Sequence, residues 1–235
     1  MNYRITGTGS CIPDIAIKNS DFLKNKFLDT DGGKFKSSNS EIIDKFNSIT
    51  GIYERRYASD EINCSDLAAV AADLAINDSK LDQETLDYII VAHNTGDISC
   101  SSGQVDTLPS VASKVKAKLK IKNPNCVAYD IICGCPGWVE GIIQAKSFIK
   151  SGMAEKCLVI GCDTLSRIRD ENDRDSMIYA DGSGAIVLES DSSYDGGILS
   201  HKSATFTYEG ENDFIFYGTS YDTRKRSKSD QKFIK

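Results

Sequence analysis

One cysteine in the sequence lies where a predicted strand turns into a predicted helix. Cys135 follows the apolar run 126–132 and precedes Pro136, whose fixed φ and missing N–H suit the first turn of a helix. Free N–H groups at such a turn and the positive end of the helix dipole favour a thiolate over a thiol. A thiolate can attack an acyl thioester and retain the acyl group, while the N–H of Cys135 can bind the oxyanion that forms. The pattern alone fits an activated nucleophile and a buried structural cysteine equally well.

The eight cysteines do not otherwise have the spacing of a metal site or a disulfide framework. They show no CxxC…CxxC arrangement, and no ligand-spaced cysteine lies near His93 or His201. We therefore expect no metal site and no cofactor, and we interpret most of the thiols as buried. His93 directly follows the apolar run 88–92, where a hydrogen-bonded structural histidine is commoner than a catalytic one.

Cys135 is positioned by segments that alternate between strand-like and helix-like patterns. Strands are predicted at residues 2–9, 88–92, 126–132, 157–161 and 184–188. Helices are predicted at residues 40–48, 66–77 with Ser65 as the N-cap, 109–119 and 136–149. Several of the strands are continuous apolar runs, typical of strands buried on both faces. This alternation predicts an α/β fold with a largely parallel central sheet covered by helices.

The composition is that of an ordinary soluble globular protein. Of the 235 residues, 40% are hydrophobic and 26% are charged, and the formal net charge is −6. This acidic balance argues against general nucleic-acid binding. No apolar run approaches the roughly 20 residues of a membrane span, and the first residues lack the pattern of a signal peptide. We therefore expect a cytoplasmic protein with no membrane span and no nucleic-acid partner.

Several short motifs occur in the order in which one family of condensing enzymes carries them. The motifs lie at residues 7–13, 50–56, 65–68, 108–110, 130–138, 163–166, 173–174 and 181–185. The sequence from Cys135 to Trp138 is similar to the Cys-x-Gly-aromatic segment of the β-ketoacyl-acyl-carrier-protein synthase III family. Over residues 1–200 the chain resembles this family, which implies a thiolase-like fold with Cys135 as the catalytic cysteine. The segment 181–184 resembles the family's Gly-Asp-Gly-Ala-Gly-Ala motif, and we interpret it as a tight buried turn rather than a binding site.

The resemblance also implies a division of the chain. Synthase III enzymes have two similar α/β halves, and the second half supplies a His and an Asn that hold the carbonyl of a malonyl unit. Residues 1–200 correspond to the N-terminal half with the nucleophilic cysteine, and residues 201–235 to the start of a connection to a missing C-terminal half. Neither His93 nor His201 lies where the family places its catalytic histidine. The chain is therefore expected to be an incomplete enzyme.

The substrates and partners implied by the resemblance are an acyl thioester, carried by coenzyme A or by acyl carrier protein, and malonyl-acyl carrier protein. Many family members grip the adenine end of coenzyme A with a Trp and an Arg, and Lys45 and Ile49 occupy the matching positions. This difference favours a carrier protein as the acyl donor. Leu108 matches a substrate-binding residue of the acyl pocket, often contributed across a homodimer, and the segment between Asp97 and Leu108 is longer than is usual.

Two other functions are compatible with the motif around Cys135. An α/β cysteine hydrolase or amidotransferase also uses a strand–cysteine–helix junction, but it needs a histidine as a base. A non-catalytic partner subunit of a condensing enzyme would share the fold, although such subunits usually lose the cysteine. The presence of Cys135 argues against the second alternative.

Overall fold

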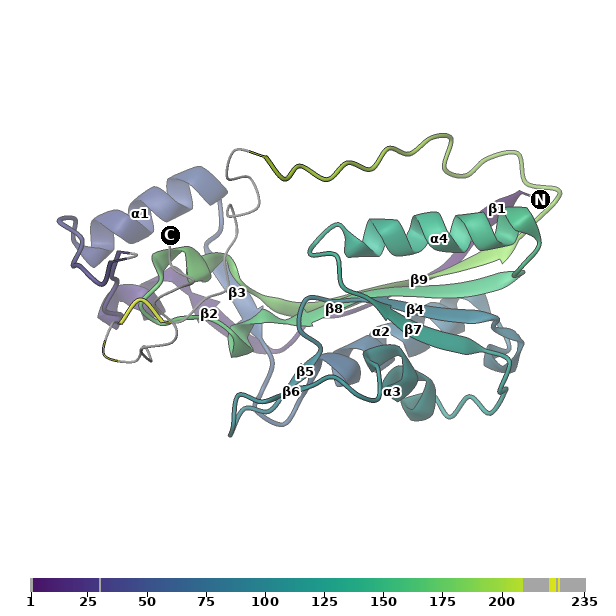
Figure 1. The fold of residues 1–235 in the computed structure, drawn as a ribbon, viewed down its shortest axis with the longest axis horizontal. Helices are drawn as coiled ribbons and strands as arrows, with labels where there is room; N and C mark the ends of the chain where they lie inside the picture. Colours follow the sequence, from purple (N-terminus) through teal and green to yellow (C-terminus); the bar gives the residue numbers. More distant parts are fainter. Residues whose placement is uncertain (1, 30, 209–219, 223, 225–235) are drawn as a thin grey trace. The chain divides into compact units, whose positions relative to one another are not determined.

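The computed structural model describes residues 2–29, 31–208, 220–222 and 224 (Figure 1). The chain divides into two compact units. The first comprises residues 1–15, 56–167 and 180–201, and the second comprises residues 16–55, 168–179 and 202–235. Most of the predicted connection at 201–235 lies outside the described residues, so the boundary at residue 200 stays a prediction.

A five-stranded sheet forms the centre of the first unit, with the strand order β1-β9-β8-β4-β7. The strands are β1 (Tyr3–Cys11), β4 (Tyr88–Ala92), β7 (Val127–Ile131), β8 (Lys156–Thr164) and β9 (Asp181–Ser190). All five confirm predicted strands, and β4 has the predicted bounds. β7 lies at an edge of the sheet and is only partly buried, which differs from the doubly buried strand expected there.

The prediction of a largely parallel sheet is wrong for half of the strand pairs. β4 runs parallel to β7 and β8, whereas β9 runs antiparallel to both β8 and β1. A parallel pair needs a crossover, usually through an α-helix. Between β8 and β9 the chain forms only the short 3-10 helices η3 (Leu165–Arg167) and η4 (Arg174–Ile178), and β9 returns antiparallel to β8. A short apolar run does not distinguish these two directions, which explains the error.

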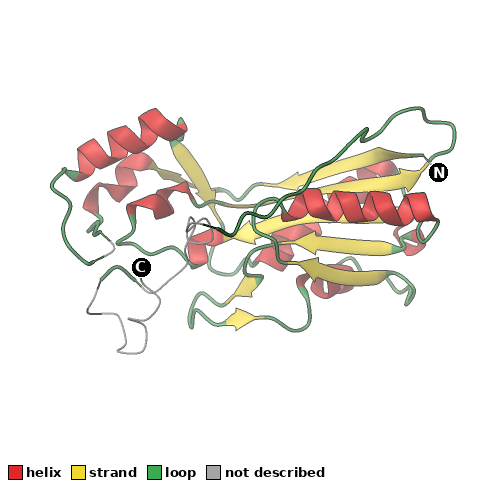
Figure 2. Cartoon of the chain, turned by 45° about the horizontal axis from the view of Figure 1, so that its top comes forward, coloured by secondary structure: helices red, strands yellow, loops and turns green. Residues whose placement is uncertain are grey.

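Helices cover both faces of this sheet. The helices α2 (Cys64–Ser79) and α3 (Val111–Lys118) lie on one face and α4 (Gly137–Ser151) lies on the other (Figures 1 and 2). Each side has its own cluster of buried apolar side chains. This arrangement confirms the α/β fold with a helix-covered sheet. No described helix is both long enough and apolar enough to cross a membrane.

The N-termini of two of these helices differ slightly from the prediction. Asn63, and not Ser65, is the N-cap of α2, and Ser65 lies inside the helix. Ser65 instead donates two hydrogen bonds to Asp97, from its N–H and its hydroxyl. Ser110 caps α3, since its hydroxyl accepts from the N–H of Ser113 at 3.1 Å. The Ser110 hydroxyl satisfies an N–H group that the first turn of α3 leaves free, whereas at α2 the Asp97 carboxylate does so for Ser65.

The second unit contains α1 (Asn39–Thr50), which begins at the capping box of Ser38 and Glu41. Arg55 places its guanidinium 4.9 Å from the ring centroid of Phe22 and 5.8 Å from that of Phe46. The remaining elements of the chain are β2 (Ile15–Lys18), η1 (Asn19–Lys24), β3 (Glu54–Tyr57), η2 (Gln83–Thr85), β5 (Asp97–Ile98) and β6 (Val105–Asp106). β2 pairs with β3, and β5 pairs with β6 in a short hairpin.

Two glycines of β1 let helix α2 approach the sheet very closely. A Cβ atom on Gly7 would lie 2.1 Å from the carbonyl oxygen of Ala75, and one on Gly9 would lie 2.2 Å from that of Ala71. Residues two apart share one face of a strand, and residues four apart share one face of a helix. The pairs therefore meet as two matched rows of small residues, and a larger side chain at Gly7 or Gly9 would push α2 away.

We predict that Gly9→Ala lowers the free energy of unfolding by about 1–3 kcal/mol, the usual cost of overpacking a closely packed contact. Gly184→Ala is the matched control, because the nearest atom to its new methyl group would be the carbonyl oxygen of Gly9 at 4.0 Å. The control should change stability by less than about 1 kcal/mol. Urea denaturation of both variants measures the difference, and equal losses would contradict the close approach described for β1.

Candidate active site

Cys135 lies in the short loop between β7 and α4, directly before the helix N-cap. Pro136, the predicted first helical residue, is the N-cap instead, and α4 begins one residue later at Gly137. The preceding Gly134 has φ of 65°, a left-handed conformation that favours glycine. Its carbonyl accepts from the N–H of Gly137 at 3.0 Å and closes the turn. The turn leaves the Cys135 side chain exposed at the positive end of α4.

A cavity of about 400 Å³ opens beside this cysteine within the first unit. Its lining comes from the ends of β4 and β8, the beginning of β9 and the first turn of α4. The lining residues are Ala92, His93, Gly134, Cys135, Trp138, Gly161, Cys162, Asp163, Leu165, Ala180, Asp181, Gly182, Ser183 and Gly184. Among the described residues, no group of three or more His, Cys, Asp and Glu side chains could hold a metal ion. The cavity therefore combines one exposed thiol with several buried polar groups.

Trp138 forms one wall of the cavity by packing flat against the backbone of β8. A Cβ atom on Gly161 would lie 3.2 Å from three atoms of Trp138, so a larger residue there would require the indole to shift slightly. The indole Nε1 is buried and has no hydrogen-bond partner among the described residues. The aromatic residue of the predicted Cys-x-Gly-aromatic segment thus contributes directly to the cavity next to Cys135.

The carboxylate of Asp130 joins β7 to β4 and to the start of α3. It accepts hydrogen bonds from the N–H groups of Val111 and Ala112, at 2.7 and 2.8 Å, and lies 3.0 Å from Nε2 of His93. Partial burial by itself would raise the pKa of Asp130, but the bonds from His93 and from the two N–H groups lower it. The ionised carboxylate is therefore the form that the fold stabilises.

His93 is almost fully buried, with only 6% of its side chain exposed. Its Nε2 faces Asp130, and its Nδ1 is buried without a partner in the described part of the chain. With the imidazole neutral, this arrangement makes Nε2 the donor and leaves Nδ1 as an acceptor. His93 thus fits the structural interpretation of a hydrogen-bonded histidine at a strand end, although part of it lines the cavity.

Asp163 is a partly buried carboxyl group that lines the cavity, and its pKa shifts in the opposite direction from that of Asp130. It accepts from the backbone N–H of Asn94 at 2.9 Å and from its Nδ2 at 2.6 Å. Burial nevertheless raises the pKa of Asp163 above its ordinary value, and the negative charge of Asp181 contributes in the same direction. Asp163 begins the motif at residues 163–166, and the sequence alone predicted no role for it.

The prediction of a tight turn at residues 181–184 is wrong. These residues begin the long strand β9 and line the cavity. The Asp181 carboxylate accepts from the N–H of Ala58 at 2.8 Å and from the N–H and hydroxyl of Ser166, at 2.8 and 2.6 Å. The pattern of small residues alone did not distinguish a strand from a turn.

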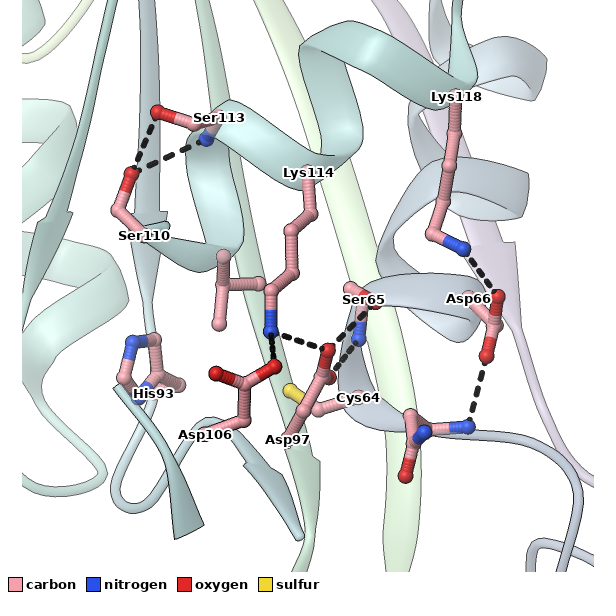
Figure 3. A network of polar contacts seen from close by, with 12 residues as sticks. Cys64, Ser65, Asp66, His93, Asp97, Asp106, Ser110, Ser113, Lys114 and Lys118 are labelled. Carbon is pink, nitrogen blue, oxygen red and sulfur yellow. Dashed lines mark hydrogen bonds and ion pairs between the residues drawn. The ribbon is translucent and has the colours of Figure 1, made fainter. Parts of the chain in front are cut away.

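The segment between Asp97 and Leu108 carries the β5–β6 hairpin, which a lysine anchors to the helices. Lys114 of α3 donates to Asp97 at 2.9 Å and to Asp106 at 2.7 Å (Figure 3). Burial would lower the pKa of Lys114, but the hydrogen bonds to Asp106 and Asp97 raise it. Asp97 also accepts both bonds from Ser65, so one carboxylate connects the hairpin to α2 and α3.

The structure does not bring the other predicted binding residues into this cavity. Leu108 follows β6, is 81% exposed, and is not part of the lining. Lys45 and Ile49 line a different cavity of about 530 Å³ inside the second unit. That cavity also contains Phe35, whose ring centroid lies 4.6 Å from the guanidinium carbon of Arg174. The second unit therefore has an independent cavity with cationic and aromatic walls.

We predict that Asp130→Asn lowers the free energy of unfolding at pH 7 by about 1.5–3 kcal/mol, the usual contribution of hydrogen bonds to a charged group. Because the folded pKa of Asp130 is lowered, this contribution is fully present above the unfolded pKa of about 3.9. It should disappear as the pH falls through the folded pKa. Urea denaturation from pH 7 to pH 3 measures the difference between the variant and the wild type.

Asp163→Asn is the matched comparison, since the pKa of Asp163 is raised. Ionising Asp163 costs stability in the folded protein, so this variant should gain stability relative to the wild type as the pH rises. The same pH dependence for both variants would contradict the assignment of opposite environments to the two carboxyl groups.

Comparison with known proteins gives a consistent family assignment. Residues 129–206 match the family model of 3-oxoacyl-[acyl-carrier-protein (ACP)] synthase III. The chain is 36% identical over 198 residues to a beta-ketoacyl-[acyl-carrier-protein] synthase III of Ehrlichia ruminantium, covering 84% of this chain and 55% of that protein. It is 39% identical over 190 residues to the enzyme of that name from Neisseria gonorrhoeae, covering 80% of this chain and 52% of the relative.

Solved structures give the same result. The 3-oxoacyl-[acyl-carrier-protein] synthase III of Aquifex aeolicus superposes with a TM-score of 0.65 at 33% identity, covering 81% of this chain and 55% of that chain. The enzyme FabH from Pseudomonas aeruginosa gives a TM-score of 0.66 at 27% identity, covering 85% and 55%. The chain spans about half the length of the curated relatives that it matches. By sequence and by its thiolase-like fold, this chain is similar to β-ketoacyl-[acyl-carrier-protein] synthase III enzymes over about half of their length.

Proposed function

We propose that this chain is the cysteine-bearing half of a condensing acyltransferase, with Cys135 as the residue that accepts the acyl group. The observation that carries the proposal is the position of an exposed thiol at the N-terminus of α4, beside a cavity, in the segment that matches the family. A helix N-terminus stabilises the thiolate that such a reaction needs. The cavity gives the reacting thioester a space beside that sulfur.

In the proposed first step, the Sγ atom of Cys135 attacks the carbonyl carbon of an acyl thioester. The carbonyl oxygen becomes an oxyanion, and when the carbonyl re-forms the donor leaves as a thiol. The N–H of Cys135 has no hydrogen-bond acceptor among the described residues, so it is available to bind that oxyanion. The acyl group is left on the cysteine as a new thioester.

In the proposed second step, a malonyl unit on acyl carrier protein loses carbon dioxide, and the resulting carbanion attacks the acyl-cysteine. This step needs hydrogen-bond donors at the malonyl thioester oxygen. The family resemblance implies that a His and an Asn outside this chain supply them. His93 does not replace them in the proposal, because its Nε2 is bonded to Asp130 and its Nδ1 is buried. The same geometry disfavours a cysteine hydrolase that uses His93 as its base.

We further propose that the acyl donor is a carrier protein and that the working enzyme is a homodimer in the cytoplasm. Lys45 and Ile49 stand where many relatives use a Trp and an Arg for the adenine of coenzyme A, and neither side chain can stack on a base as those can. Leu108 is 81% exposed on its own chain. That exposure supports a role for Leu108 in the acyl pocket of a second copy rather than in its own.

We predict that Cys135→Ser abolishes acyl transfer to the protein, whereas Cys133→Ser retains it. Cys133 is the matched control, because it is also exposed and lies two residues earlier in the same loop. Incubation with an acyl carrier protein thioester and with acetyl-coenzyme A, followed by intact-mass measurement, detects the added acyl group. Acylation that persists in Cys135→Ser would contradict the assigned nucleophile, and faster transfer from coenzyme A would contradict the proposed donor.

We also predict that this chain alone does not form a β-ketoacyl product from acyl and malonyl thioesters. Removing even one preorganised oxyanion donor costs on the order of 10²–10³ in rate, and both proposed donors lie outside the chain. The assay compares the purified chain with and without the C-terminal half of a homologous synthase, expressed separately. Condensation by this chain alone, abolished by Cys135→Ser, would show that no second half is required.

A further inference from the structure

Two buried cysteines from distant parts of the sequence lie in direct contact beneath the candidate active site. The Sγ atoms of Cys64 and Cys162 are 2.9 Å apart. Cys64 is the first residue of α2, and Cys162 lies in β8, 98 positions later in the chain. Cys64 is fully buried and Cys162 is 4% exposed. The pair therefore connects the N-terminus of α2 to β8, a strand that contributes to the cavity lining.

The surroundings of the pair leave each thiol with the other as its hydrogen-bond partner. Both belong to the apolar cluster between the sheet and α2, together with Ala68 and Ala185. The bond to Cys162, together with burial, raises the pKa of the Cys64 thiol. No cluster of ligands that could hold a metal includes either cysteine in the described part of the chain. Metal binding is therefore not the role of this pair.

Of the two cysteines, only Cys162 is a lining residue of the candidate active-site cavity. Cys162 lines the cavity of about 400 Å³ that also contains Cys135, whereas Cys64 does not line it. A small oxidant that reaches the Cys162 sulfur from that cavity would have the Cys64 sulfur 2.9 Å away. Figure 3 shows Cys64 next to Ser65 and the Asp97 network at the start of α2, so the inner thiol sits on an anchored element.

We propose that Cys64 and Cys162 form a reversible disulfide when a peroxide enters the Cys135 cavity. The Cys162 sulfur attacks one oxygen of hydrogen peroxide, the O–O bond breaks, and water leaves, which gives a sulfenic acid at Cys162. The Cys64 sulfur then displaces the hydroxyl group from that sulfur, which releases a second water. Two thiols and one peroxide thus become one disulfide and two waters, and a dithiol reductant reverses the change.

The geometry requires little movement for this reaction, since the sulfurs have to approach from 2.9 Å to about 2.05 Å. The bond would tie α2 to the strand that carries Cys162 and Asp163, at the wall of the cavity. It would also close a loop of the unfolded chain between two residues 98 positions apart, which restricts that chain and favours the folded protein. This inference does not depend on the proposed acyl transfer.

The test uses the full chain with the exposed thiols removed, as Cys100→Ser, Cys133→Ser and Cys135→Ser together, so that peroxide does not react with them. After exposure to hydrogen peroxide, the protein is denatured in N-ethylmaleimide and digested without reduction. We expect the loss of two alkylated thiols and a peptide that joins Cys64 to Cys162. The oxidised protein should also unfold at a higher urea concentration, and dithiothreitol should reverse that shift.

Cys157→Ala in the same background is the matched control, because Cys157 is a fully buried thiol of β8 on the other face of the sheet. It should leave the linked peptide and the urea shift unchanged, whereas Cys64→Ala should remove both. The variant that lacks only the exposed thiols keeps both Cys64 and Cys162. Its linked peptide and urea shift therefore decide the proposal even if Cys64→Ala folds poorly. Oxidation that leaves Cys64 and Cys162 fully alkylated, or that yields only sulfinic acid at Cys162, would overturn it.

Discussion

The carboxylate of Asp130 is the interaction on which the arrangement of the candidate active site depends. It accepts from the first two N–H groups of α3 and from His93 at the end of β4, while it belongs itself to β7. One side chain thus fixes two neighbouring strands and one helix five residues before Cys135. Because His93 and two backbone N–H groups all favour the charged form, the ionised carboxylate is retained despite its burial.

The register of the parallel strands explains why the functional side chains meet. Ala92 pairs with Ile131 in β7 and with Gly161 in β8, so β4 and β7 end at one level and β8 continues beyond it to Thr164. The loop with Cys135 begins just beyond this level, and Asp163 lies two residues beyond Gly161. Ligand sites of α/β sheets commonly lie outside these carboxyl ends. The antiparallel β9 then closes the cavity, since its first residue, Asp181, pairs with Thr164.

The polar groups at this edge have separate roles, although they lie close together. Asp130 and Asp181 are saturated by backbone and hydroxyl donors and hold loops in place. In the described part of the chain, Asp163 accepts hydrogen bonds only from Asn94, and its pKa is raised. The thiols divide in the same way: Cys135 is exposed in the loop, and Cys162 lies below it against Cys64. The cavity is therefore lined by the exposed Cys135 and by Cys162, whose sulfur contacts that of the buried Cys64.

The sequence by itself determined the main helices, the strands of the central sheet and the place of Cys135 between a strand and a helix. Local signals such as the apolar run 88–92 and the Cys135–Pro136 junction depend only on neighbouring residues, and they predicted β4 with its bounds and α4 to within two residues. Only the tertiary structure decided the direction of β9, the cap of α2 and the meeting of Cys64 with Cys162. These features depend on which distant segments pack together. Burial, hydrogen-bond partners and strand direction are properties of that packing, and no local pattern encodes them.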